Sequence, residues 1–575
     1  MKFSESPLLP LRLSVGRARF VLILLLAAFV AMLVRALMLQ GLDDERLRLR
    51  GEARKSGMER IAAHRGRIVD RHGTLLAAST PARAIGAYPE EARLTPAQLR
   101  DLAASLAMPV SDVSRRLAED SRFVLLKRQV APKVADELLA LKLPGLKSDV
   151  EYRRYYPAAD VAAHVVGFTD VDDRGQEGVE LSFEKSLSGQ PGSTRVLRDG
   201  RRRIVEHIEH LRSPRDGEDV QLALDGKLQF LAYSHLRQAV EDNRARAGAV
   251  VVLDVDTGEI LALANLPSYN PNDRQGLSGE QLRNRALTDT FEPGSTLKPM
   301  TIALALETGR VRPDTPIQTA PGRLTIGNAT ISDVHPHGLL SVAEVIQKSS
   351  NVGAAKIAEK LSPEEMWSMF VALGFGSPPG LGFPGEAAGR VRPFARWRPI
   401  EQATMSYGHG IAVSLTQLAH AYLVFARDGD LLPLSLLRRD AGPVTGRQVF
   451  SPATARAVRA MLEMAVLPGG TAPKAQIPGF RVAGKTGTAH KLENGVYARR
   501  YVSSFVGFAP VSRPRLIVAV MIDEPSAGKH YGGDVAAPVF ARIMEDSLRA
   551  RGVVPDAPVK PPVQLVTTRA SGGRL

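Results

Sequence analysis

Five apolar segments between residues 249 and 522 fall into two groups, which are separated by a long stretch of sequence. Ala249 to Leu253 and Ile260 to Asn265 flank the turn sequence Asp256-Thr257-Gly258, and together they predict a hairpin. Three more strands are predicted far downstream, at Val482 to Ala489, Tyr501 to Ala509 and Leu516 to Ile522. The sequence between the two groups is helical. This order predicts an α+β domain, in which both ends build one antiparallel sheet and helices pack on both faces.

The region upstream of this domain mixes short strands and helices. Turn-forming residues at Ser213 to Gly217 mark a boundary, which places the sheet domain at 217–550. Before it, Ala63 to Leu76 predicts a hairpin around a His-Gly turn, and Thr95 to Gln98 predicts a capped helix start. Residues 61–216 are therefore expected to form a mixed α/β pedestal domain. The proline- and glycine-rich tail, 551–575, is expected to be disordered.

An apolar run near the N-terminus predicts a membrane anchor at 20–39. Phe20 to Val34 is uninterrupted, and the stem of Arg35 can carry its charge to the interface. Basic residues before the run favour a cytoplasmic segment at 1–19. A cleaved signal peptide is the alternative, but no Ala-x-Ala-like site follows the run. The charged segment 40–60 is then a juxtamembrane helix or spacer, and the domains that follow are expected in the periplasm, outside the inner membrane.

Charge and cysteine content exclude several classes of function. The net charge of +15 admits nucleic acid, anionic lipid or an acidic polymer as partner. Nucleic acid is not expected, because no nucleic-acid motif and no basic block with interleaved aromatic residues is present. The chain has no cysteine, which excludes thiolate catalysis, cysteine-based zinc sites and disulfides.

Ser295 and Lys298 form the first pair of residues that could carry chemistry. The apolar run from Met300 to Leu306 predicts a helix, so that the hydroxyl and the amine lie on one face, one turn apart. Such a pair can act as nucleophile and base, although helix capping would explain the same residues. Pro299 removes a backbone donor and predicts an irregular first turn at the serine.

Two further polar segments lie downstream of this pair. Ser349 and Asn351 fall between two predicted helices, with Asn351 as the cap of the second, and capping alone would account for them. Lys485-Thr486-Gly487-Thr488 lies inside a predicted strand, where an interior glycine often marks the close approach of another backbone or a ligand. An edge strand protected by a lysine is the alternative interpretation.

Taken together, the three segments resemble those of penicillin-binding proteins and class A β-lactamases, whose motifs are Ser-x-x-Lys, Ser-Asp-Asn and Lys-Thr-Gly. Ser350 is the one departure from the middle motif. Upstream, Arg65-Gly66-x-Ile68-x-Asp70-Arg71-x-Gly73 and the stretch from Arg153 to Glu180 are similar to the N-terminal module of class B penicillin-binding proteins. With the single anchor, the chain looks like the septal, cell-division type of this class. No glycosyltransferase domain fits before the pedestal, which argues against class A enzymes.

The resemblance implies a peptidoglycan D,D-transpeptidase that forms a serine acyl-enzyme on the D-Ala-D-Ala end of a stem peptide. Ser295 would be the nucleophile. Lys298 would be its base, with a pKa lowered by burial and by Lys485. Ser349 would relay a proton to the leaving amine, and Asn351 would bind the substrate amide. The lysine of the third motif, with Thr486, Gly487 and Thr488, would face a terminal carboxylate.

Other features of the site are also implied by the resemblance. The backbone N–H groups of Ser295 and Thr488 would hold the oxyanion. Tyr407 and Tyr531 would line the pocket, although a packing role is equally open. No cofactor is implied. His335 and His337 could suggest a metal site, but without a third ligand at recognisable spacing they are interpreted as part of a flexible loop.

The implied partners are peptidoglycan stem peptides, β-lactams, the inner membrane, a SEDS-family glycosyltransferase and other division proteins. Three rival functions use the same motifs. A β-lactamase or carboxypeptidase would take water as acceptor, a penicillin sensor would signal inward, and a scaffold would keep a relict site. The anchor and pedestal are unneeded for the first, and the few residues before Phe20 leave no room for the output domain of the second.

Overall fold

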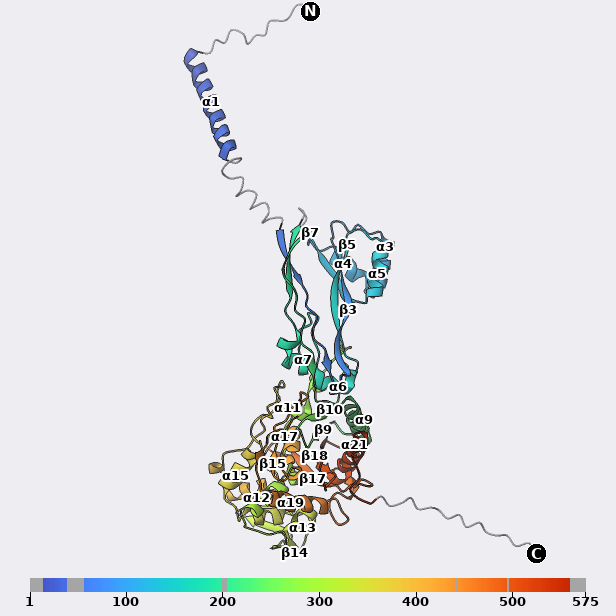
Figure 1. Cartoon of the computed structure of the whole chain (residues 1–575), viewed down its shortest axis with the longest axis vertical. Coiled ribbons are helices and arrows are strands. Elements are labelled where there is room, and N and C mark those ends of the chain that lie inside the picture. The colour runs from blue at the N-terminus through green and yellow to red at the C-terminus, as the bar shows by residue number, and fades with distance from the viewer. Residues whose placement is uncertain (1–13, 39–55, 199–203, 441, 494–495, 559–575) are drawn as a thin grey trace, which may run out of the picture. The chain divides into compact units, whose positions relative to one another are not determined.

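A computed structural model describes residues 14–38, 56–198, 204–440, 442–493 and 496–558 of the 575-residue chain (Figure 1). The described residues divide into two compact units. One lies within residues 1–64 and 189–216, and the other within residues 65–188 and 217–575. The expected pedestal, 61–216, therefore contributes to both units.

The first unit contains helix α1 (Val15–Leu37) and a three-stranded sheet. Within the described part of the chain, α1 is the one helix that is long and apolar enough to cross a membrane. The antiparallel sheet has the order β1-β6-β7, formed by β1 (Ser56–Ile61), β6 (Gly192–Arg198) and β7 (Ile204–Arg212). Most of the segment 40–60 lies outside the described residues. Its last part begins β1, where a helix was one expectation.

The second unit begins with the predicted hairpin, in which β2 (Ile68–Val69) pairs with β3 (Leu75–Ala87). The predicted capping box at Thr95 is confirmed, since its side chain and that of Gln98 each accept a bond from the other's backbone N–H. The remaining elements here are α3 (Pro96–Ser105), α4 (Val110–Leu117), β4 (Val124–Val130), α5 (Pro132–Ala140), β5 (Leu146–Tyr155), α6 (Ala159–Val166), α7 (Gly178–Ser182) and α8 (Glu184–Leu187).

A buried charge cluster joins the two segments that carry the upstream resemblance. Glu180 is fully buried, and its two carboxylate oxygens accept hydrogen bonds from the Nε atoms of Arg65 and Arg154, each at 2.7 Å. Because a buried charge is costly unless it is paired, removing one member would leave the others uncompensated. The cluster therefore fixes the start of the hairpin against α7 and β5.

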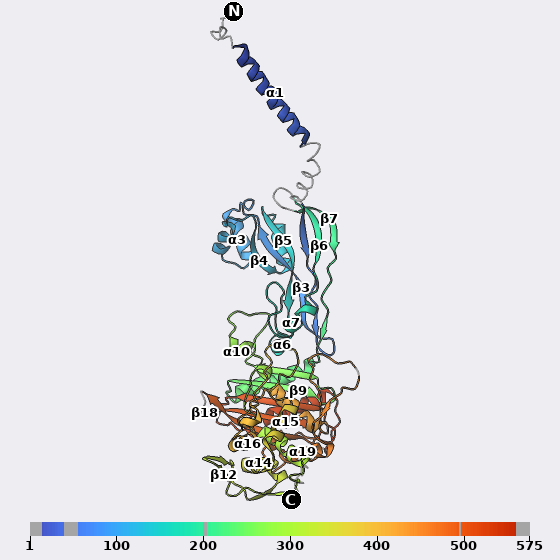
Figure 2. The same cartoon turned by 90° about the vertical axis from the view of Figure 1, so that its left-hand side faces the viewer.

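The later part of the second unit is built on one antiparallel sheet, as the strand pattern predicts; β9 and β18 of this sheet are labelled in Figure 2. The strand order is β10-β9-β19-β18-β17. Its strands are β9 (Ala247–Asp254), β10 (Ile260–Leu266), β17 (Ala483–Glu493), β18 (Val496–Ala509) and β19 (Leu516–Asp523). Successive side chains enter opposite cores: Val250 and Val252 enter one, and Ala249 and Val251 the other. This alternation follows from the two-residue period of a strand.

Helices cover both faces of this sheet. Short β8 (Val220–Gln221) leads into α9 (Gly226–Asp242), which packs with α21 (Ala537–Ala550) on one face (Figure 1). Two other helices, α11 (Arg285–Thr288) and α17 (Leu415–Ala421), contact the opposite face. The expected α+β class with an antiparallel sheet between helices is confirmed.

The segment between β10 and β17 is mainly helical and carries much of the larger core. Its helices are α10 (Gly279–Leu282), α12 (Lys298–Glu307), α13 (Val342–Lys348), α14 (Asn351–Ala358), α15 (Pro363–Ala372), α16 (Pro399–Met405), α18 (Leu423–Ala426) and α19 (Pro452–Met464). Three small hairpin-like pairs interrupt it: β11 (Pro316–Gln318) with β14 (Leu339–Ser341), β12 (Arg323–Ile326) with β13 (Ala329–Ser332), and β15 (Asp430–Leu431) with β16 (Arg447–Gln448).

The start of the C-terminal tail is held against the domain. The Asp556 carboxylate accepts hydrogen bonds from the backbone N–H groups of Arg481, at 2.7 Å, and Ser512, at 3.0 Å. Ala557 donates to the carbonyl of Gly479. The expectation of disorder from residue 551 is therefore wrong for residues 551–558, and residues 559–575 lie outside the described part.

Candidate active site

Ser295 lies in an irregular turn at the start of α12. Gly294–Leu297 forms a 3₁₀ turn that runs directly into the α-helix, and Pro299 occupies the first turn of that helix. The predicted irregularity is confirmed. Because proline supplies no N–H and crowds the preceding turn, it favours a helix start at this point.

Glycines let this turn approach strand β17 closely. Gly294 has a φ of 57°, and a Cβ added to it would lie 3.4 Å from the carbonyl oxygen of Thr488. A Cβ on Gly487 would lie 2.8 Å from the carbonyl oxygen of Pro293 and 2.3 Å from Ser504 Oγ. The glycine inside the strand thus marks the approach of another backbone, as its position predicts.

Lys298 is fully buried beside the Ser295 hydroxyl. Its Nζ lies 3.0 Å from Ser295 Oγ, 3.1 Å from Ser349 Oγ and 2.8 Å from Asn351 Oδ1. Burial lowers the pKa of Lys298 well below its ordinary value, and the nearby charge of Lys485 lowers it further, against a smaller opposing effect of Asp333. The expected direction of the pKa shift is confirmed.

Ser349 connects the two motif lysines. Its Oγ also accepts a hydrogen bond from Lys485 Nζ at 2.9 Å, and its backbone carbonyl accepts one from Lys298. Lys485 is fully buried, and burial lowers its pKa to about 7. Ser349 has a φ of 62°, a left-handed conformation that is rare for residues with a Cβ. Such strain is often found where the surrounding structure fixes a functional group.

Asp333, which belongs to none of the three motifs, accepts hydrogen bonds from residues of the middle motif. The cap of α14 is Ser350 and not Asn351, since Ser350 Oγ accepts from the N–H of Gly353 at 2.9 Å. Asp333 accepts from Ser350 Oγ at 2.7 Å and from the N–H groups of Asn351 and Val352. A carboxylate at a helix N-terminus satisfies donors that have no partner within the helix.

Both polar atoms of the Asn351 side-chain amide form hydrogen bonds. Its Oδ1 accepts from Lys298, and its Nδ2 donates to the carbonyl of Ser332 at 3.0 Å. Among the described residues, Ser332 is the one acceptor of the Nδ2 group, which has two N–H donors.

The motif residues open onto a cavity of about 520 Å³. Ser295, Ser349 and Asn351 line one part, and Thr486, Thr488 and Tyr531 line another. Residues that carry no motif complete the lining, among them Asp333, His335, His337, His409 and Thr471. Two hydroxyls on the β17 side have hydrogen-bond partners: Thr488 Oγ1 accepts from the backbone N–H of Gly532, and Thr486 Oγ1 lies 3.1 Å from the side-chain Oγ1 of Thr471.

Two expected positions differ from the structure. Tyr407 is nearly buried and does not line the cavity; its ring lies 6.0 Å from Lys298 Nζ, behind the base, and its neighbour His409 lines the cavity instead. Lys485 also does not line the cavity. Its Nζ lies within hydrogen-bond distance of the Ser349 and Thr486 hydroxyls, which do line the cavity, so its charge acts on the cavity through them.

Comparison with known families agrees with this geometry. Residues 248–545 match the penicillin-binding protein transpeptidase domain, and residues 60–222 match the penicillin-binding protein dimerisation domain. The chain belongs to the class B penicillin-binding proteins. This family assignment confirms the predicted fold class and the serine-type D,D-transpeptidase class of enzyme.

Individual relatives of this penicillin-binding protein cover nearly its whole length. It is 44% identical over 95% of its chain to the probable peptidoglycan D,D-transpeptidase PenA of Neisseria meningitidis, covering 94% of that protein. It is 42% identical over 93% of its chain to the peptidoglycan D,D-transpeptidase FtsI of Escherichia coli, covering 91% of that protein. The transpeptidase domain of Burkholderia pseudomallei penicillin-binding protein 3 is 51% identical, with a TM-score of 0.55, and spans 59% of this chain and 98% of that one.

Proposed function

We propose that this penicillin-binding protein cross-links peptidoglycan stem peptides during septal wall synthesis, through an acyl-enzyme on Ser295. The observation that carries the proposal is the contact of Lys298 Nζ with Ser295 Oγ at 3.0 Å, in a buried site where the lysine is readily neutral. A serine hydroxyl becomes an effective nucleophile when an adjacent base takes its proton.

In the acylation step, Ser295 Oγ attacks the penultimate D-alanine carbonyl and its proton passes to Lys298. The backbone N–H groups of Ser295 and Thr488 would hold the oxyanion, since donors fixed before the reaction need no reorganisation. Ser349 Oγ lies within hydrogen-bond distance of both lysines and would pass the proton to the leaving amine. The C–N bond then breaks and D-alanine leaves.

Substrate binding is proposed for the β17 side of the cavity. The terminal carboxylate would contact the hydroxyls of Thr486 and Thr488, with Lys485 supplying positive charge behind them. Asn351 would donate its remaining N–H to the substrate amide. Gly487 serves by allowing the strand to lie against the nucleophile turn. A β-lactam carboxylate would occupy the same place, which makes β-lactams inhibitors of this site.

The cellular setting is also proposed. Helix α1 would be a single-pass anchor in the inner membrane, with the N-terminus in the cytoplasm and the catalytic domain in the periplasm; Arg17 and Arg19 at its start support this orientation. A SEDS-family glycosyltransferase and other division proteins would supply and organise the glycan strands. The proposed domain division between residues 216 and 217 is supported by the turn sequence there, shortly before the dimerisation-domain match ends at residue 222.

Cross-linking of lipid-linked strands in the presence of a partner polymerase tests the proposal. The wild-type protein should form dimeric stem products and release D-alanine, and Ser295→Ala should form none. If the wild-type protein releases D-alanine but forms only trimmed stems, water is the acceptor and the protein is a carboxypeptidase.

A further inference from the structure

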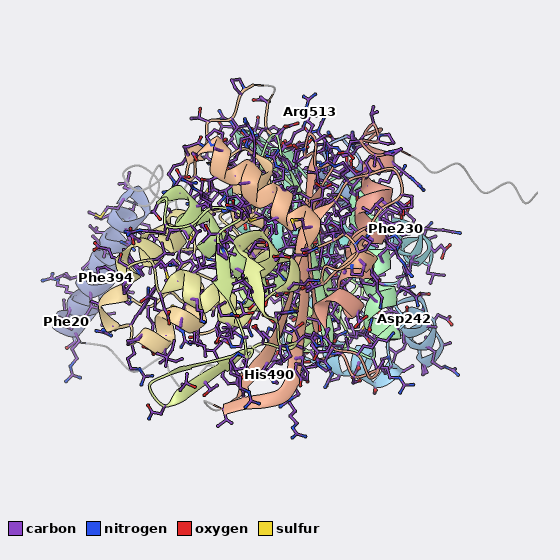
Figure 3. All side chains as sticks on the ribbon, turned by 90° about the horizontal axis from the view of Figure 1, so that it is seen from below. Phe20, Phe230, Asp242, Phe394, His490 and Arg513 are labelled. Atoms are coloured by element: carbon purple, nitrogen blue, oxygen red, sulfur yellow. The ribbon has the colours of Figure 1, made fainter. Side chains whose placement is uncertain are left out.

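A second cavity, of about 460 Å³, lies beside the catalytic one and is rich in cationic residues. We call it the arginine pocket, defined by Arg246, Arg283, Arg285, Arg390 and Lys491 with the carboxylates Asp289, Glu292 and Asp523. Its lining includes the residues just before the nucleophile turn, Thr290 to Glu292, and those just after the third motif, Ala489 to Lys491. His490 lies where the strands reach the edge of the domain (Figure 3).

Five cationic side chains and three carboxylates line the arginine pocket. Glu280 and Glu524 pair with Arg246, and Asp523 and Glu524 pair with Lys491. Asp289 is shared between Arg283, at 2.6 Å, and Arg285, at 3.1 Å. The Arg390 guanidinium is exposed and forms no hydrogen bond or ion pair with any residue that the structure describes. Arg285 is almost fully buried, and its Nε has no acceptor among the described residues. The exposed and unpaired guanidinium of Arg390 in this recess favours an anionic ligand.

Only a thin wall separates the arginine pocket from the catalytic cavity. Glu292 lines the pocket, His409 lines the cavity, and Glu292 Oε2 lies 3.7 Å from His409 Nδ1. The same carboxylate accepts hydrogen bonds from the Gly410 N–H at 2.8 Å and from the Tyr497 hydroxyl at 3.1 Å. The arginine pocket and the catalytic cavity therefore adjoin at the contact between Glu292 and His409.

From this geometry, and resting on the proposed function, we infer that the arginine pocket binds the carboxylates of the acceptor stem peptide. An acceptor stem carries an amine and, like the donor, ends in a carboxylate. With its carboxylate in the pocket, its amine would reach past Glu292 towards the ester on Ser295.

The reaction at that ester is a balanced acyl transfer. The neutral amine forms a C–N bond to the acyl carbon, and the bond from that carbon to Ser295 Oγ breaks. The proton lost by the amine returns to Ser295 Oγ through Lys298. Holding the amine near the ester raises its effective concentration above that of water, which favours cross-linking over hydrolysis.

The first test compares two acceptors on the wild-type protein: a tetrapeptide stem ending in a carboxylate, and the same peptide ending in a carboxamide. A synthetic stem thioester serves as donor. The carboxylate acceptor should have a KM about fivefold lower, as expected for one partly exposed ion pair. Added salt should reduce the difference. Equal KM values at low salt would overturn the inference without any variant.

The second test removes charge from the arginine pocket. Arg390→Gln and Arg283→Gln should each reduce the preference for the carboxylate acceptor towards unity. Arg396→Gln, which removes an exposed arginine from outside the pocket, should keep the wild-type preference. A preference that survives in both pocket variants contradicts the inference.

Labelled penicillin separates this inference from the proposed function. If wild-type Ser295 takes no label, the acyl-enzyme itself is wrong. If wild type and pocket variants are labelled and the acceptor preference does not depend on the pocket, only the assignment of the arginine pocket fails.

Discussion

Lys298 and Lys485 share one hydrogen-bond acceptor, the Oγ of Ser349, at 3.1 and 2.9 Å from their Nζ atoms. Two buried ammonium groups this close repel each other, so the site favours a state in which only one of them is charged. Lys298 lies beside the nucleophile, and we expect it to be the neutral lysine of the pair.

The pH dependence of penicillin acylation should therefore be bell-shaped. The second-order rate constant should rise with pH as Lys298 loses its proton, and fall above about pH 7 as Lys485 does. Stopped-flow acylation from pH 5 to 9 measures both limbs. Lys485→Arg should flatten the falling limb, because a guanidinium stays charged over this range. A falling limb unchanged in Lys485→Arg would contradict the assignment.

Replacing Lys485 by methionine should stabilise the catalytic domain while it slows acylation. The pKa of about 7 lies below the value in the unfolded chain, so burying this amine costs free energy at low pH. The gain from Lys485→Met should be about 1 kcal/mol or more at pH 6. It should shrink as pH rises from about 7 towards 10.5, where the unfolded chain also loses the proton. Denaturant titration at several pH values measures this, with exposed Lys360→Met as the control.

Two substitutions distinguish the effect of the left-handed backbone at Ser349 from the effect of its hydroxyl. Ser349→Ala and Ser349→Gly both remove Oγ and should both slow acylation by about 100-fold or more, the usual contribution of a proton-transfer group. Glycine adopts a φ of 62° freely, so Ser349→Gly should be the more stable of the two by about 1 kcal/mol. Thermal unfolding and acylation rates together check this. An active glycine variant would show that the hydroxyl carries no proton.

The charge of Asp333 should raise the pKa of Lys298. This charge opposes the lowering of the Lys298 pKa, so Asp333→Asn should lower that pKa further and move the rising limb of acylation to lower pH. The asparagine oxygen can still accept from the α14 backbone N–H groups, which limits the loss of stability. Exposed Asp314→Asn should leave the limb where it is. A shift to higher pH would contradict the electrostatic role.

The sheet and the motif residues could be predicted from the sequence because each leaves a local pattern. The uninterrupted apolar run from Leu516 to Ile522 marks a strand with two buried faces. The three motifs fall in order on a nucleophile turn, an interhelical turn and a strand. Pro299 also indicated the irregular turn before the structure showed it.

Other features depend on contacts between distant segments and leave no such pattern. Strand β1 was not expected because its partner, β6, lies far along the chain. Asp333 carries no motif and reaches the site only when β13 packs beside α14. Tyr407 and His409 are separated by one residue, and packing alone decides that the histidine lines the cavity. The cap at Ser350 was missed because serine and asparagine are equally good caps.

Peptide mapping of the protein after reaction with labelled penicillin tests the central claim most directly. All label should be on the peptide that contains Ser295, and Ser295→Ala should take none. Lys298→Met should keep the fold and lose most of the labelling rate. Label on a different residue, or an undiminished rate in Lys298→Met, would contradict the account.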